Sequence, residues 1–147
     1  MSLENFTFTR EQLEHDIQQL PDEALLMPHP LVESLARQFR HVADIAELYA
    51  TALKSGVVDF SQKREDRAMQ NNPTQLRQHF LTQRAWVADQ ITAVPREAWT
   101  TATIAFPDMD ALTPAQLVGI LAQHEALHLG IIWTVARFLG HEIADPY

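Results

Sequence analysis

The sequence contains no cysteine, and this absence excludes several kinds of chemistry. Among its 147 residues there are seven histidines but no thiol. Disulfide bonds, thiolate metal sites and a cysteine nucleophile are therefore excluded, so that a metal site has to rely on histidine and carboxylate ligands. A chain without disulfide bonds is suited to a reducing compartment, and we expect a cytoplasmic protein.

Basic residues and long apolar runs are scarce as well. Eleven lysines and arginines stand against 19 acidic residues, which gives a formal net charge of −8. Nucleic-acid binding relies on basic side chains that neutralise phosphates, so we expect no nucleic-acid partner. No apolar run approaches the roughly 20 residues of a membrane span, and the residues before Arg10 lack the features of a signal peptide. We therefore expect no membrane association.

Apolar residues are nevertheless numerous enough to form one core. They make up 46% of the chain, and 147 residues correspond to a single domain spanning 1–147. Apolar side chains recur three or four positions apart in four segments, which is the spacing of amphipathic helices. The predicted helices span residues 9–20, 31–53, 72–95 and 113–140, with one further turn at 22–27.

The predicted helices have recognisable starts and stops. Thr9, Asn72 and Thr113 are good N-caps, and proline follows directly after the last two. Gly56 and Gly140 are natural stops. Residues 99–112 show no helical period and read as a longer loop before the last helix. We therefore expect an all-α fold, an antiparallel four-helix bundle.

Two histidines lie one turn apart in the last predicted helix. His124 and His128 are separated by about 40° around the helix axis, on the face that carries apolar residues. These apolar residues are Leu117, Leu121, Ile131 and Val135. Imidazoles that point into a core need partners, and a divalent metal ion suits two neutral imidazoles at this spacing. Core histidines that bond to Tyr, Ser or carboxylate groups are the alternative.

A third ligand has to come from another helix. His41 is the best candidate, because it lies in the middle of the second predicted helix on a partly apolar side; His79, in the third, is the competing candidate. Three histidines leave one position of a zinc-like ion open. The inward positions near the pair are apolar (Leu121, Leu127 and Ile131), which favours an open position over a fourth protein ligand.

The segment from His124 to His128 also matches H-E-x-x-H, the zinc-protease helix in which the glutamate is the general base. The extended form of that motif needs a further histidine at position 134, where this chain has Thr134. No sheet is predicted either, so a protease is less favoured. Glu125 lies about 100° around the helix from His124, and we consider it as a proton shuttle or, alternatively, a solvated side chain.

The arrangement of these histidines resembles the DinB/YfiT-like superfamily of metal-binding four-helix bundles. The similarity covers nearly the whole chain, including residues 20–25, 40–42, 124–130 and 137–140. It implies a metal triad of His41, His124 and His128, a zinc or nickel ion, and a homodimer. Where members often read His-Arg-Gly-Gln, this chain has Leu129 and Ile131 in place of Arg and Gln.

The resemblance also implies a class of function. Characterised members include S-transferases and isomerases that use low-molecular-weight thiols. We therefore expect a metal-dependent enzyme of the hydrolase or thiol-dependent S-transferase type that acts on a small-molecule substrate. A non-catalytic bundle that binds a metal or a small ligand is the alternative.

Overall fold

The computed structural model describes residues 3–62 and 68–143, with side chains from residue 6 onward. Four long helices form the bundle: α1 (Leu3–Gln19), α3 (Leu35–Ser55), α4 (Pro73–Thr92) and α5 (Pro114–Phe138). A short helix, α2 (Asp22–Leu26), follows α1. Three 3-10 turns lie in the connections, at Phe60–Gln62, Met69–Asn71 and Arg96–Trp99. The described residues form only isolated bridges outside these helices, so the expected all-α bundle with a longer loop before its last helix is confirmed.

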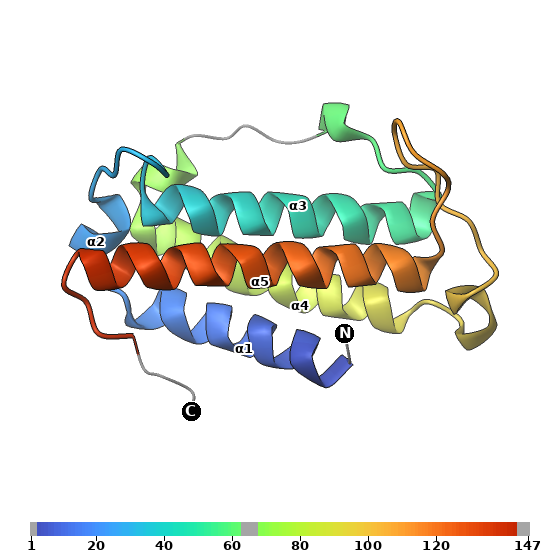
Figure 1. Ribbon diagram of the computed structural model, residues 1–147, viewed down its shortest axis with the longest axis horizontal. Coiled ribbons are helices and arrows are strands. Elements are labelled where there is room, and N and C mark those ends of the chain that lie inside the picture. The colour runs from blue at the N-terminus through green and yellow to red at the C-terminus, as the bar shows by residue number, and fades with distance from the viewer. Residues whose placement is uncertain (1–2, 63–67, 144–147) are drawn as a thin grey trace.

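The helices do not simply alternate in direction. In Figure 1, α1 and α5 run one way along the bundle, and α3 and α4 run the other way. The parallel packing of α3 and α4 is also visible in contacts: Phe39 meets Phe80, and one turn later Gln83 donates a hydrogen bond to the carbonyl of Ala43. The antiparallel order therefore holds for α1 with α4 and for α3 with α5. The connection over residues 56–72 is long enough to return the chain to the end where α3 began.

Helix starts are set by capping side chains at three places. Asn72 accepts a hydrogen bond from the amide of Gln75, and Thr113 forms a complete capping box with Gln116. These two starts were predicted. The start of the second predicted helix at residue 31 is wrong, because Ser34 caps α3 and the strained Glu33 before it (φ 64°) is not helical. Leu31 is left 85% exposed in the connection.

The first helix is longer than its local sequence signal indicates. Thr9 was predicted as its N-cap, but α1 begins at Leu3 and Thr9 is a buried residue within it. Phe6 explains the extension, since it is buried against the cluster that includes Ile45 and Leu121. Tertiary packing of that turn thus outweighs the capping preference of Thr9.

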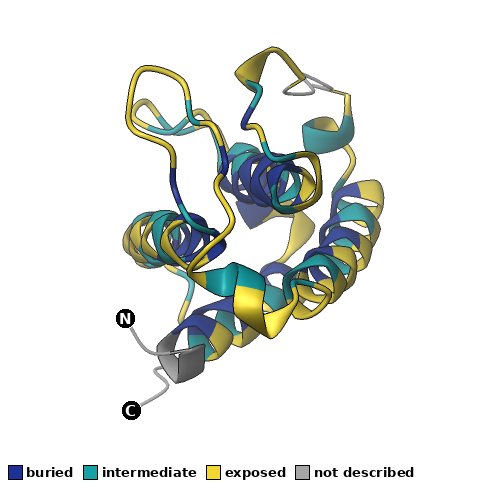
Figure 2. Cartoon of the chain, turned by 90° about the vertical axis from the view of Figure 1, so that its right-hand side faces the viewer, coloured by how far each residue is buried: buried dark blue, intermediate teal, exposed yellow. Residues whose placement is uncertain are grey.

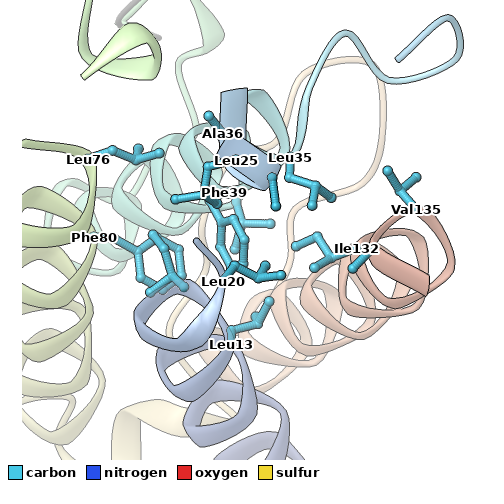
Figure 3. Close-up of a cluster of buried hydrophobic side chains, with 14 of the residues drawn as sticks. Leu13, Leu20, Leu25, Leu35, Ala36, Phe39, Leu76, Phe80, Ile132 and Val135 are labelled. Carbon is cyan, nitrogen blue, oxygen red and sulfur yellow. The ribbon is translucent and has the colours of Figure 1, made fainter. Parts of the chain in front are cut away.

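The core runs the length of the bundle in two clusters of apolar side chains. Figure 2 shows the buried faces of the helices turned toward the bundle interior. The cluster at the end beside α2 brings together side chains from all five helices (Figure 3), with Phe39 and Phe80 packed edge to face at a centroid distance of 5.5 Å. Within residues 3–62 and 68–143, none of the helices combines the length and the apolar character of a membrane span.

Candidate metal centre

Three histidine side chains converge between α3 and α5. His41 comes from the second turn of α3, and His124 and His128 come from the middle of α5. One nitrogen of each ring lies within 4.8 Å of the corresponding nitrogens of the other two. The Nε2 atoms of His41 and His124 are 3.1 Å apart. The predicted grouping of these three histidines is therefore confirmed.

The spacing of these nitrogens suits a metal ion. A tetrahedral zinc ion with Zn–N bonds of 2.0–2.1 Å requires ligand nitrogens about 3.3 Å apart, close to the observed separation of His41 and His124. All three rings are half-buried, which leaves one side of the group accessible. Among the described residues, no Asp, Glu or fourth His belongs to this group, so it offers three protein ligands.

Gln38 orients one of the three rings. Its Oε1 lies 2.9 Å from Nδ1 of His128, so that this nitrogen carries the proton and Nε2 is left as the metal-binding atom. The amide of Gln38 is itself held, because its Nε2 donates to the carbonyl of Val32 at 3.3 Å. No sequence motif indicated a role for Gln38. It could have been found from the antiparallel packing of α3 on α5. If His41 faces His124, then Gln38, one turn before His41, faces His128, one turn after His124.

Replacing Gln38 should weaken metal binding without removing a ligand. We expect Gln38→Leu to lower the affinity for zinc by about 10- to 100-fold, the range measured when hydrogen-bond partners of metal-ligating histidines are removed. Gln38→Glu keeps an acceptor at the same position and should retain the affinity. Competition with a chromophoric chelator measures the zinc affinity of both variants. Equal affinities for Gln38→Leu and the wild type would show that the bond to His128 has no effect on the site.

His128 is neutral in the folded protein at physiological pH. Burial of the ring, with additional repulsion from His124 and Arg37, lowers the pKa of His128 from 6.5 to about 4. A neutral imidazole is the form that binds a metal ion. The same shift affects stability, because the unfolded chain takes up a proton at His128 at a higher pH than the folded chain does.

The metal-free protein should consequently lose stability as the pH falls from about 6.5 toward 4. In that window the unfolded state binds more protons than the native state, so the contribution of His128 is complete above pH 6.5 and is lost on acidification. The variant His128→Gln cannot take up this proton and should show a smaller loss. Urea unfolding in the presence of a chelator at several pH values measures the difference. Identical pH profiles for the two proteins would contradict the assignment.

The remaining candidates near the site fall into different environments. His79 is half-buried on α4 and is not part of the histidine group. Leu121 is buried, as expected of an inward position, and Ile131 is half-buried. The inward placement of Leu127 is wrong, because this side chain is 63% exposed. It projects from the side of α5 that faces away from the core.

Glu125 is fully buried, on the side of α5 that faces α1 and α4. Its carboxylate accepts hydrogen bonds from Arg84 at 2.6 and 3.1 Å and from Arg10 at 3.2 Å. Arg84 is 1% exposed and Arg10 is 8% exposed. The alternative of a solvated Glu125 is therefore wrong: at that angular position the side chain enters the bundle interior, where two guanidinium groups compensate its charge.

These contacts leave the zinc-protease interpretation without its general base. In that mechanism the glutamate has to reach a water molecule on the metal, whereas both oxygens of Glu125 are engaged by arginines. The role of Glu125 as a proton shuttle remains a prediction. Burial of Arg10, together with the positive charge of the adjacent Arg84, lowers the pKa of Arg10 to about 10.

Comparison with known proteins agrees with this geometry. A family model described as the DinB superfamily matches residues 5–132, a range that includes all three histidines, Gln38 and Glu125. No curated protein matches the chain. The histidine group together with the family match fits a metal-binding protein of this kind.

Proposed function

The chain belongs to the DinB superfamily, and from this premise we propose that it is a divalent-metal-dependent enzyme of the hydrolase or thiol-dependent S-transferase type. The observation that supports the proposal is the convergence of His41, His124 and His128 without a fourth protein ligand among the described residues. A site with three protein ligands keeps one position for water or substrate, which is the arrangement of catalytic rather than structural zinc centres.

The residues of the chain have separate tasks in this proposal. His41, His124 and His128 would hold the ion, and it would supply Lewis-acid chemistry that lowers the pKa of a bound water or thiol. Gln38 fixes the tautomer and orientation of His128. Leu121 and Ile131 lie one turn before and after the histidine pair, and their apolar side chains limit the water around the site.

The proposal extends to the ion, the partners and the location. We propose zinc or nickel as the metal, a small-molecule substrate, and a low-molecular-weight thiol as cosubstrate for the transferase type. We further propose a cytoplasmic homodimer that binds no nucleic acid. The net charge of −8 supports the last point, since duplex DNA would repel such a surface.

Two assays on protein purified without a His-tag test the reaction type. The protein is stripped with a chelator and reconstituted with zinc or nickel. Hydrolysis of p-nitrophenyl esters reports hydrolase activity, and conjugation of an electrophilic bimane with glutathione or cysteine reports thiol transfer. His128→Ala is the metal-site control in both assays. Turnover that depends on the metal and is lost in this variant supports the proposal.

The alternative is a bundle that binds a metal or a small ligand without turnover. It predicts stoichiometric metal in the purified protein together with no metal-dependent rate in either assay. That result would replace the enzyme proposal by the binding-module interpretation.

A further inference from the structure

An apolar groove lies beside the metal centre, on the outer side of α5. It has a volume of about 830 Å³ and is formed by residues 29–32 of the α2–α3 connection and by α5 between Ala126 and Phe138. The α2–α3 connection and the last turns of α5, which form its two walls, lie at the same end of the bundle in Figure 1. Its volume is within the range of about 300–1,000 Å³ that is usual for small-molecule sites.

The side chains that line the groove are unusually exposed for their type. Leu31, Leu127 and Phe138 are 85%, 63% and 80% exposed, and these are the three highest values among the exposed large apolar side chains of the described residues. All three line the groove. Single exposed apolar residues are ordinary, but several around one hollow indicate a surface that is covered when a ligand is bound.

Residues that line the groove adjoin the histidine group, although none of the three histidines lines it. Leu127 directly precedes His128, and Ile131 follows it by one turn on the groove side of α5. On the other wall, the carbonyl of Val32 accepts the hydrogen bond from Gln38, and Gln38 orients the ring of His128. A molecule that extends beyond this end of the groove would therefore approach the metal-binding histidines.

The wall opposite α5 is held in place. His29 donates its amide to the carbonyl of Glu33 at 2.7 Å, and the amide of Leu31 donates to Nδ1 of His29 at 3.3 Å. The ring of His29 packs edge to face on Phe138 at a centroid distance of 5.9 Å. These contacts connect the two walls, so the groove is formed before any ligand arrives.

We propose that the substrate of the metal centre carries an uncharged apolar tail, an alkyl chain or an aromatic group, which lies in this groove while the polar head reaches the ion. The inference rests on the function proposed above. No Asp, Glu, Lys or Arg lines the groove, and the hydroxyl of Thr134 is engaged by the carbonyl of Gly130. The lining therefore offers a tail apolar contact and little opportunity for hydrogen bonding.

Alkyl hydroxamates of increasing length test the tail separately from the head. Their head group chelates metal ions, and the tail varies from acetohydroxamate to octanohydroxamate. With zinc-loaded protein, we expect octanohydroxamate to bind about 100-fold more tightly, the equivalent of burying three or four methylene groups at about 0.8 kcal/mol each. Calorimetry gives the ratio of the two dissociation constants in each protein.

Groove variants should lower this ratio. Leu31→Ser and Phe138→Ser each remove an exposed side chain, so the fold should tolerate them, and each should reduce the ratio by at least about tenfold. Met109→Ser is the matched control: Met109 is 50% exposed and lies in the loop before α5, outside the groove. Its ratio should equal that of the wild type.

Three results would overturn the proposal. Equal affinities for the short and long hydroxamates would show that no tail is bound, and a lower ratio in Met109→Ser would show that the effect is not specific to the groove. If the wild type is a dimer in sedimentation equilibrium and Phe138→Ser is a monomer with an unchanged ratio, the groove binds a second copy of the chain.

Failure of acetohydroxamate itself to bind would contradict the proposed open metal position and not the groove. The groove is then tested alone with 1-octanol, whose binding Phe138→Ser should weaken.

Discussion

Replacing His128 with alanine should abolish stable metal binding and leave a folded helical bundle. The substitution removes one of three nitrogen ligands that lie within 4.8 Å of one another. The two histidines that remain, His41 and His124, are too few for a three-ligand site. We expect the variant to lose its zinc on dialysis, whereas the wild type retains about one ion per chain.

The fold should survive because the bundle has stabilising contacts that do not involve the metal. Two clusters of buried apolar side chains extend along the bundle, and side chains cap the N-termini of α3, α4 and α5. Zinc fingers, by contrast, have almost no core and are unfolded without their metal. His128 itself is only half-buried, so its truncation leaves no large cavity.

Metal analysis and circular dichroism together decide this prediction. Metal content is measured by mass spectrometry on protein purified without a His-tag, and thermal unfolding is followed at the helix band. His79→Ala is the matched control, because His79 is half-buried on a helix but lies outside the histidine group. If His128→Ala unfolds, and the wild type also unfolds on chelation, the metal is structural and the enzyme proposal loses its main support.

The sequence predicts the elements of the fold better than their ends. Helix spacing and the caps at Asn72 and Thr113 are local signals, and the structure bears them out. The start of α1 depends on distant contacts instead. Phe6 extends α1 because it is buried against α3 and α5, and no pattern within residues 1–10 contains that information. The direction of α4 likewise depends on how the long connection before it is placed.

The metal ligands could be predicted because their signal is periodic. His124 and His128 share one helix face, and the family resemblance added His41. The partners of Glu125 could not be found in this way, since Arg10 and Arg84 are 115 and 41 positions away in the sequence. From the sequence alone, a glutamate beside an apolar helix face can be either exposed to solvent or buried in an ion pair. Only the packing of α1 and α4 against α5 shows that Glu125 is buried.

Three apolar residues that continue the helical pattern do not lie in the core. Leu31, Leu127 and Phe138 extend the apolar periods of their segments, but all three are exposed around the groove. Periodicity reports that a surface is apolar and does not report what covers it. This mismatch between pattern and burial is the feature from which the substrate tail is inferred.

Replacing Glu125 with alanine should destabilise the protein more than any change on its surface. Arg84 and Arg10 would remain buried without the carboxylate that compensates their charges, and breaking a buried ion pair in this way costs about 3–5 kcal/mol. The free energy of unfolding of a domain is only about 5–15 kcal/mol, so the loss would be a large fraction of the total. We expect Glu125→Gln to cost less, because its amide oxygen still accepts one hydrogen bond.

An exposed ion pair of the same bundle serves as the control. Asp22 bonds Arg77 at 2.6 Å, as short as the contact of Glu125 with Arg84, but the Asp22 side chain is 62% exposed. Asp22→Asn should therefore change the free energy of unfolding by less than about 1 kcal/mol. Urea unfolding of metal-free protein at pH 7 compares the variants. Equal small losses for Glu125→Ala and Asp22→Asn would mean that water reaches the arginines, and that burial of Glu125 does not make its contacts stronger than those on the surface.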